Sequence, residues 1–236
     1  MKSTILDKSK LVNSVFSKVY KKYDLMNDIM SFGIHRIWKD KFIDWMNPCS
    51  GSKLIDVASG TGDIAKLFSK RNENLSEITC IEPNNEMFQE GRNNLKDFKN
   101  VKWIKAKAES IPVKNNFYDF YSISYGIRNV SDINKTLKEA YRVLKPGGKL
   151  GILEFSSPHS KIVGSLFKIY FHYILPKVAS LFSRSDAYRY LPESVDFFPS
   201  RKNICDKIIN SGFKEAIYTD LTFGISSIFI GIKNDV

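Results

Sequence analysis

The residues with the clearest chemical meaning form one run, Asp56-Val57-Ala58-Ser59-Gly60-Thr61-Gly62-Asp63, between an apolar segment and a helical pattern. Gly60 and Gly62 can take backbone angles that are closed to other residues. Their missing side chains let a ligand approach the main chain and the start of the helix. Glu82 ends the next apolar segment, where a carboxylate can accept hydrogen bonds from both hydroxyls of a ribose. The pattern indicates a ligand that contains a nucleoside.

Two classes of ligand fit this loop. The glycine spacing, followed by Ala65 and later by Glu82, is also typical of nicotinamide dinucleotide sites. Asp56 favours S-adenosylmethionine, because its carboxylate can meet the amine end of that cofactor and would repel a pyrophosphate. A later run at 141–150, with its Pro-Gly-Gly turn, looks like the segment before the fifth strand of class I methyltransferases. Asp56 could also simply cap a loop, and Glu82 could begin a helix.

The elements that must position these residues alternate in type after Gly51. Strands that alternate with helices predict a mostly parallel, doubly wound α/β sheet with helices on both faces. The ligand then lies at the carboxyl ends of the strands. Two successive strands close the chain as an antiparallel hairpin. We expect strands at 53–57, 77–82, 101–105, 118–124, 149–155, 213–218 and 226–233, and helices at 63–70, 85–97, 132–144 and 201–211.

The 236 residues are predicted to form a single domain. Near the amino terminus, apolar residues recur every four positions from Leu11 to Tyr23, which favours an amphipathic helix, and 31–45 also follows a helical pattern. A long aromatic segment later breaks the strand–helix alternation. The expected parts are a helical cap at 1–50, a core at 51–159 and 199–236, and a partly helical insertion at 160–198 that acts as a substrate lid.

Several further motifs resemble those of the UbiE/MenG quinone methyltransferases, and they come in that family's order. The resemblance extends from about Val12 to Lys233, and most of these motifs are much narrower than the glycine loop. It implies a Rossmann-like, seven-stranded class I methyltransferase that uses S-adenosylmethionine and no metal. The motifs are Lys22-Tyr23-Asp24-Leu25-Met26-Asn27-Asp28, Ser31 to Lys39, Tyr125-Gly126-Ile127-Arg128-Asn129-Val130, Leu153-Glu154-Phe155-Ser156 and Tyr188-Arg189-Tyr190-Leu191-Pro192-Glu193-Ser194.

The same resemblance implies a set of cofactor contacts. The chain departs from the family at two of them: Glu82 stands where Asp is frequent, and Lys107 stands where a small polar residue such as Asn is frequent. Glu82 should serve the same ribose, whereas Lys107 leaves a side-chain contact to the adenine in doubt. Together with the loop, the expected cofactor residues are Asp56, Gly60, Thr61, Gly62, Glu82, Lys107, Ala108 and Ser124.

The implied reaction is methylation of a ring carbon in a polyprenyl quinol, either demethylmenaquinol, 2-polyprenyl-6-methoxy-1,4-benzoquinol or both. A quinol carbon becomes nucleophilic when an adjacent hydroxyl loses its proton, so the site must relay that proton and stabilise an oxyanion. Arg128 and Asn129 follow the fourth expected strand, where the methyl group should lie. Arg128 cannot be the base, so we expect it to stabilise the quinolate and orient a water. Tyr23 is a further catalytic candidate, as a hydrogen-bond partner on the amino-terminal lid. His35 could be a base, although a histidine that packs against or caps a helix is more common.

Composition limits the partners. The formal net charge of +11 comes without a basic run or an RNA-binding motif, so we expect no nucleic acid and instead a loose contact with a membrane surface. The three cysteines are widely spaced, which predicts a reduced, cytoplasmic protein without a metal cluster. We expect neither a signal peptide nor a membrane span.

The aromatic insertion can be a core helix or a wall for the polyprenyl tail with one face on the bilayer. It could also bury against a second copy in a homodimer. Other functions that fit are a methyltransferase for a sterol or small phenol, a nicotinamide oxidoreductase and an idle quinone-binding protein. The large apolar residues of the insertion, aromatic and aliphatic, are Phe167, Ile169, Tyr170, Phe171, Tyr173, Ile174, Leu175, Leu181 and Phe182.

Overall fold

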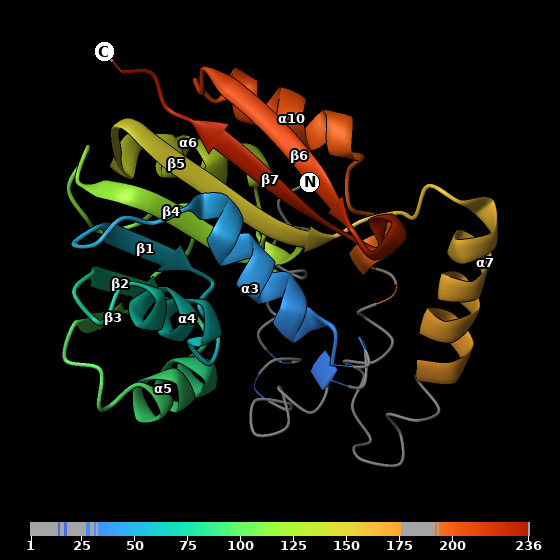
Figure 1. The fold of residues 1–236 in the computed structure, drawn as a ribbon, viewed down its shortest axis with the longest axis horizontal. Helices are drawn as coiled ribbons and strands as arrows, with labels where there is room; N and C mark the ends of the chain where they lie inside the picture. The colour runs from blue at the N-terminus through green and yellow to red at the C-terminus, as the bar shows by residue number, and fades with distance from the viewer. Residues whose placement is uncertain are drawn as a thin grey trace.

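The computed structural model describes residues 14, 17, 27, 28, 31, 33–175, 192 and 194–235. In these ranges seven strands form one sheet in the order β3-β2-β1-β4-β5-β7-β6 (Figure 1). The first five strands are parallel, and β7 runs antiparallel to both of its neighbours. The predicted α/β fold and terminal hairpin are therefore confirmed. The strands are β1 Lys53–Val57, β2 Glu77–Ile81, β3 Val101–Ile104, β4 Tyr118–Ser124, β5 Leu144–Phe155, β6 Glu215–Leu221 and β7 Ser226–Ile232.

Helices cover both faces of the sheet, as alternate residues of the strands require. On β1, Leu54 packs in the cluster beneath α3 and α4, while Ile55 and Val57 pack in the cluster beneath α6 and α10. Figure 1 shows α3 crossing the front of the sheet and α6 behind it. These helices are α3 His35–Met46, α4 Asp63–Arg71, α6 Ile133–Val143 and α10 Arg201–Asn210; α5 is Asn85–Asn94.

The prediction that a Pro-Gly-Gly turn precedes the fifth strand is wrong, because these residues lie inside β5. Tyr118 pairs with Leu144, and Phe120 pairs with Lys149, so four residues of β5 bulge opposite one residue of β4. Gly147 has a φ of 72° in this bulge, which explains a glycine there. The strand thus begins five residues earlier than the sequence pattern predicts.

The aromatic insertion starts as a helix at the far end of the sheet. Its described part comprises α7 Lys161–Ile169 and a π-helical turn, η3, Tyr170–Ile174. Figure 1 shows α7 (gold) standing beyond the ends of the strands, away from α5. The predicted stripe from Leu11 to Tyr23, and residues 176–191 and 193 of the insertion, fall outside the described residues. Within the described ranges, no helix is long and apolar enough to cross a membrane.

Candidate functional site

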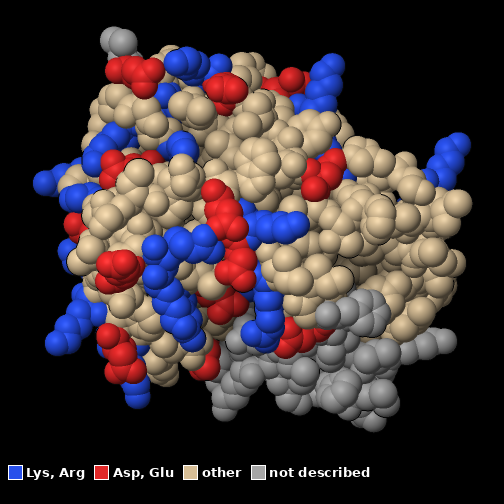
Figure 2. Space-filling model, viewed as in Figure 1, with Lys and Arg blue, Asp and Glu red and all other residues tan. Residues whose placement is uncertain are grey.

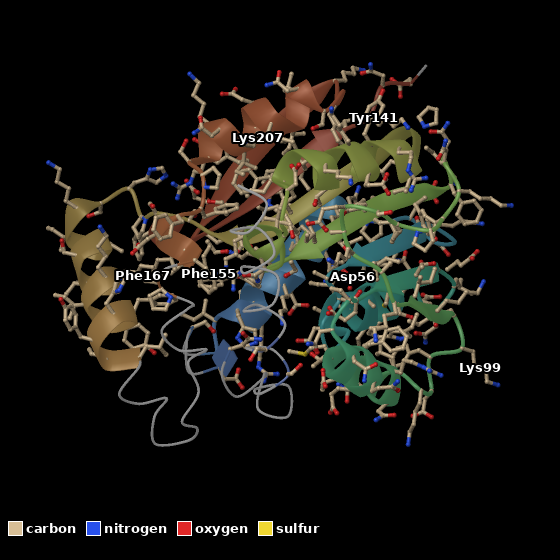
Figure 3. All side chains as sticks on the ribbon, turned by 180° about the vertical axis from the view of Figure 1, so that it is seen from behind. Asp56, Lys99, Tyr141, Phe155, Phe167 and Lys207 are labelled. Atoms are coloured by element: carbon tan, nitrogen blue, oxygen red, sulfur yellow. The ribbon has the colours of Figure 1, made fainter. Side chains whose placement is uncertain are left out.

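Asp56 lies inside β1, at the centre of the sheet. Its neighbours across the ladder are Cys80 on β2 and Ser122 on β4. The Ser122 hydroxyl donates to Oδ1 of Asp56 at 2.6 Å, while Oδ2 is buried without a hydrogen-bond partner among the residues that the structure describes. Burial raises the pKa of Asp56 to about 7. A buried carboxylate oxygen that lacks a donor is a place where a ligand N–H can bind, and Figure 3 shows the interior position of this residue.

The glycine loop joins β1 to α4 and has left-handed backbone at three positions. Ala58, Gly60 and Gly62 have φ of 52°, 56° and 91°. A Cβ on Gly62 would stand 2.7 Å from Cδ1 of Leu95, so packing as well as backbone angle requires glycine there. A Cβ on Gly60 would meet nothing within 4 Å. Gly60 is needed for its backbone angle, and the space beside it is open.

Glu82 ties the glycine loop to the end of β2. Oε2 accepts the Gly60 N–H at 3.0 Å, and Oε1 accepts the Asn84 N–H at 2.8 Å. Burial raises the pKa of Glu82 to about 7. The side chain that caps α5 is Asn84, which accepts from the Met87 N–H at 3.0 Å. Glu82 is therefore a buried acid beside the loop and not the residue that begins the helix.

A pocket lies between the carboxyl ends of β1 and β4. It brings together four of the predicted cofactor residues: Asp56, Gly60, Thr61 and Ser124. The hydroxyl oxygen of Ser124 is buried there and has no hydrogen-bond partner within the described ranges. The arrangement offers a carboxylate, a hydroxyl and open backbone to one ligand. The described residues that line it are Lys39, Asp56, Ala58, Ser59, Gly60, Thr61, Asp63, Ile64, Ser124 and Tyr125.

Sequence reasoning gave no role to two charged residues of this pocket. Nζ of Lys39, on α3, lies 2.6 Å from Oδ2 of Asp63, on the first turn of α4. Both line the pocket. The helical spacing could have drawn attention to Lys39, because it lies on the same buried side of α3 as His35, Trp38 and Phe42. A lysine in the buried stripe of a helix needs a partner.

Lys107 and Ala108, two more of the predicted cofactor residues, follow β3 and do not line that pocket. Ala108 is buried in the cluster beneath α6 and α10. The Lys107 side chain is exposed, and its carbonyl accepts the Ser110 N–H at 3.1 Å. Glu82 lies close to this region, because its N–H bonds to the Ile104 carbonyl at 3.2 Å. Three predicted residues thus lie along the β2–β3 side of the same sheet edge.

Arg128 is buried at the carboxyl end of β4, in the short 3-10 turn η2, Ile127–Asn129. Its Nη1 donates to Oε1 of Glu154 at 2.7 Å and to the Tyr125 carbonyl at 2.6 Å. Its Nε donates to the Ser194 hydroxyl at 3.3 Å, and Ser194 belongs to the insertion. Arg128 therefore links the ends of β4 and β5 to the insertion, and its ion pair is buried.

The backbone between β4 and η2 is held in an unusual conformation. Tyr125 has a φ of 53°, and the side-chain amide of Asn129 donates to its carbonyl at 3.4 Å. A Cβ on Gly126 would stand 2.7 Å from Cβ of Ala58, so the loops that follow β1 and β4 are in direct contact. Left-handed angles at Ala58 and Tyr125 cost energy that the surrounding packing must offset, and such residues cluster at functional sites.

Of the two remaining catalytic candidates, His35 and Tyr23, the structure describes only His35. His35 is buried on α3, with Nδ1 2.8 Å from the Ser31 hydroxyl. Burial lowers its pKa to about 4, so it is a neutral packing residue at physiological pH. This agrees with the simpler expectation for His35. Tyr23 lies outside the described residues.

Known proteins are similar to this one over almost the whole chain. A model of the ubiE/COQ5 methyltransferase family matches residues 3–233. A Rickettsia bellii protein named ubiquinone/menaquinone biosynthesis C-methyltransferase UbiE is 46% identical, over 96% of this chain and 94% of its own length. A Shewanella protein with the same name is 39% identical, over 96% of this chain and 92% of its own.

Solved structures share the fold at low identity. A SAM-dependent methyltransferase of Thermotoga maritima, described as a possible histamine N-methyltransferase, superposes with a TM-score of 0.67 at 20% identity, over 94% of this chain and 99% of its own. Phosphoethanolamine N-methyltransferase 2 of Haemonchus contortus, in complex with S-adenosylhomocysteine, has a TM-score of 0.63 at 13% identity, over 84% of this chain and 52% of its own. The shared feature is the sheet and its helices.

Proposed function

This chain belongs to the ubiE/COQ5 methyltransferase family, and we propose that it methylates a ring carbon of a polyprenyl quinol with S-adenosylmethionine as donor. The observation that carries the cofactor assignment is the pocket at the ends of β1 and β4, where Oδ2 of Asp56 is buried and accepts from no donor in the described part of the chain. When bound, S-adenosylmethionine supplies an activated methyl group. The protein must orient it, exclude water and prepare the acceptor carbon.

The charge pattern of the pocket favours this cofactor over a nicotinamide dinucleotide. A pyrophosphate carries two negative charges and no cation, so at the glycine loop it would leave the Asp56 carboxylate without an opposite charge. The amine of an amino-acid group is instead attracted there. Glu82 stays available to accept from ribose hydroxyls, because each carboxylate oxygen can accept more than one hydrogen bond.

Arg128 and Asn129 are the proposed catalytic residues on this chain. They stand in η2 at the end of β4, next to Tyr125, which lines the pocket. A guanidinium in a buried setting stabilises negative charge more strongly than one in water. Arg128 would stabilise the quinolate and orient the water that takes the proton, with Asn129 as a hydrogen-bond partner. Tyr23 stays a candidate for the same role from the amino-terminal cap.

We propose that the insertion forms the lid over the acceptor and a wall for its prenyl tail. Phe167 on α7 packs against Phe171 with ring centroids 4.5 Å apart, and Phe171 packs against Phe155 at 5.7 Å. Figure 3 shows Phe167 on the side of α7 where Phe155 lies. Phe155 follows Glu154, the partner of Arg128, so this aromatic row leads away from the proposed catalytic residue.

The opposite side of α7 supports peripheral contact with a membrane. Its large apolar residues are spaced four, three and four apart and are more than half exposed. Figure 2 shows that the surface over α7 carries very little charge, in contrast to the centre of the same face. The net charge of +11 would favour an anionic bilayer, while a homodimer through this face is the competing outcome. The residues are Ile162, Leu166, Ile169 and Tyr173.

A methyl-transfer assay tests the proposed reaction. The protein would be incubated with labelled S-adenosylmethionine and, side by side, a reduced demethylmenaquinone analogue and a polyprenyl methoxy-benzoquinol. We expect label in at least one ring, and the preferred ring names the acceptor class. Absence of label with both acceptors, while S-adenosylhomocysteine still binds, would reject a quinol substrate. A separate NADH titration should show no binding.

A further inference from the structure

We propose that Lys39 binds the carboxylate of the amino-acid end of S-adenosylmethionine, with Asp63 as its positioning residue and Asp56 as acceptor for the ammonium group. This assignment rests on the proposed use of that cofactor. It adds a binding residue from the helical cap to a site otherwise built from the sheet edge.

The first support is the position of Lys39. It projects from α3 and is only 6% exposed, yet its ammonium reaches the wall of the pocket between β1 and β4. A lysine is rarely this buried unless it is paired. Its hydrogen bond to Asp63, at 2.6 Å, occupies one of three N–H donors. The ammonium can therefore hold a second anion on the pocket side while Asp63 keeps it in place.

The second support is the balance of charge. Among the residues that the structure describes, the pocket is lined by one cation, Lys39, and two carboxylates, Asp56 and Asp63. The amino-acid end of the cofactor carries one ammonium and one carboxylate. When Asp56 pairs with the ammonium and Lys39 with the carboxylate, every charge has an opposite neighbour. A neutral or purely cationic ligand would leave Lys39 with Asp63 alone and gain nothing from it.

The third support is the start of α4. Its N-cap is Gly62, which provides no side-chain cap. The first N–H groups of a helix have no acceptor within the helix, and the helix dipole adds positive potential there. Asp63 and Ile64, the first residues of α4, both line the pocket. A ligand carboxylate beside Lys39 would meet this positive end as well, so two features of different origin favour an anion at one place.

The competing explanation is that Lys39 and Asp63 only fasten α3 to α4. That role predicts that removing Lys39 weakens every ligand of the pocket equally, through a general loosening. Our assignment predicts a loss that depends on the ligand carboxylate. The two explanations therefore predict different ligand selectivity, and a measurement of activity would not distinguish them.

Isothermal titration with two ligands makes this test. One is S-adenosylhomocysteine, and the other is S-adenosyl-3-thiopropylamine, which lacks only the carboxylate. In the wild-type protein, we expect S-adenosylhomocysteine to bind at least about tenfold more tightly, as for a lost charge-assisted hydrogen bond. Lys39→Met should weaken S-adenosylhomocysteine by about tenfold or more and leave the analogue within about threefold. Lys39→Arg should recover part of the loss.

Lys41→Met is the matched control, because Lys41 lies on the same helix with an exposed side chain; it should change neither affinity. Equal weakening of both ligands by Lys39→Met, or no weakening, would overturn the assignment. So would a wild-type protein that binds the two ligands equally, a result that needs no variant to fold. If the wild-type protein bound neither ligand, the proposed cofactor would fall, and Lys39 with it.

Discussion

Arg128 and Glu154 form a buried ion pair between the ends of β4 and β5, with Nη1 2.7 Å from Oε1. The Glu154 side chain is fully buried and that of Arg128 is 5% exposed. Oε2 of Glu154 also accepts the Arg128 N–H at 3.3 Å, so the acid holds both the side chain and the main chain of its partner. The proposed catalytic guanidinium is thus fixed by a residue on the neighbouring strand.

Glu154→Gln should destabilise the protein strongly. The variant keeps the size of the side chain but takes the Glu154 carboxylate away from the buried Arg128 guanidinium, and breaking such a pair costs about 3–5 kcal/mol. Urea denaturation followed by circular dichroism measures the loss. Asp44→Asn removes an exposed pair with Arg71 and should cost about 1 kcal/mol or less. Equal losses in the two variants would contradict a special role for the buried pair.

Asp56→Asn should stabilise the ligand-free protein at pH 8. Burial raises the pKa of Asp56 to about 7 from 3.8, so the folded state holds a proton that the unfolded state releases. The stability of the wild-type protein should therefore fall as pH rises from about 4 to about 7. The variant avoids this loss, which is worth up to about 4 kcal/mol above pH 7.

Thermal unfolding of both proteins at pH 5 and pH 8 checks this prediction. The stability gained by Asp56→Asn should be larger at pH 8. The same variant should bind S-adenosylhomocysteine more weakly, because an amide cannot neutralise the ligand ammonium. A gain that is independent of pH would mean that the Asp56 carboxyl does not titrate in this range.

Cofactor affinity should decrease as the pH falls below about 7. Burial raises the pKa of both Asp56 and Glu82 to about 7, and both must be ionised to accept from the ligand. Binding then requires proton release at lower pH, so Kd for S-adenosylhomocysteine should rise about tenfold or more from pH 8 to pH 6. Titration calorimetry in buffers of different ionisation enthalpy measures the released protons. A constant Kd across this range would refute the coupling.

Gly91→Ala should disturb the glycine loop from a distance. The added methyl group would stand 2.9 Å from the Gly60 carbonyl oxygen and would collide with the Trp103 ring. Overpacking of this kind typically costs about 1–3 kcal/mol, and here it also displaces the loop, so both stability and S-adenosylhomocysteine affinity should fall. Gly164→Ala is the control, since its methyl group meets nothing within 4 Å on α7. That change should be neutral or stabilising by up to about 1 kcal/mol.

Leu166→Glu should weaken binding to anionic vesicles without unfolding the protein. Leu166 is 62% exposed on the outer side of α7, so the new charge is solvated in the free protein and must be desolvated at a bilayer. Sedimentation with phosphatidylserine vesicles at low salt measures the change. Lys138→Glu, at an exposed position on α6, is the control, because it changes the net charge by −2 where Leu166→Glu changes it by −1. If the wild-type protein does not sediment with the vesicles, the proposed membrane contact is excluded.

The sequence by itself determined the fold class, the family and most of the residues that line the pocket at the ends of β1 and β4. Strand–helix alternation and the run from Asp56 to Asp63 are local signals, readable without knowing which segments meet. The boundaries of β1 and β4 follow from their apolar runs and agree with the structure. The bulge in β5 did not follow, because a Pro-Gly-Gly run has the same appearance in a turn and in a bulge; the partner strand decides between them.

Only the tertiary structure decided the electrostatics of the site. Lys39 reaches Asp63, and Arg128 reaches Glu154, across 24 and 26 residues of chain. Such pairs depend on how α3 crosses the sheet and on which strands are neighbours. The raised pKa of Asp56 likewise comes from burial by β2 and β4, which no local pattern specifies. Local residue types state what chemistry is available, whereas packing determines which charges are paired and which oxygen is left for a ligand.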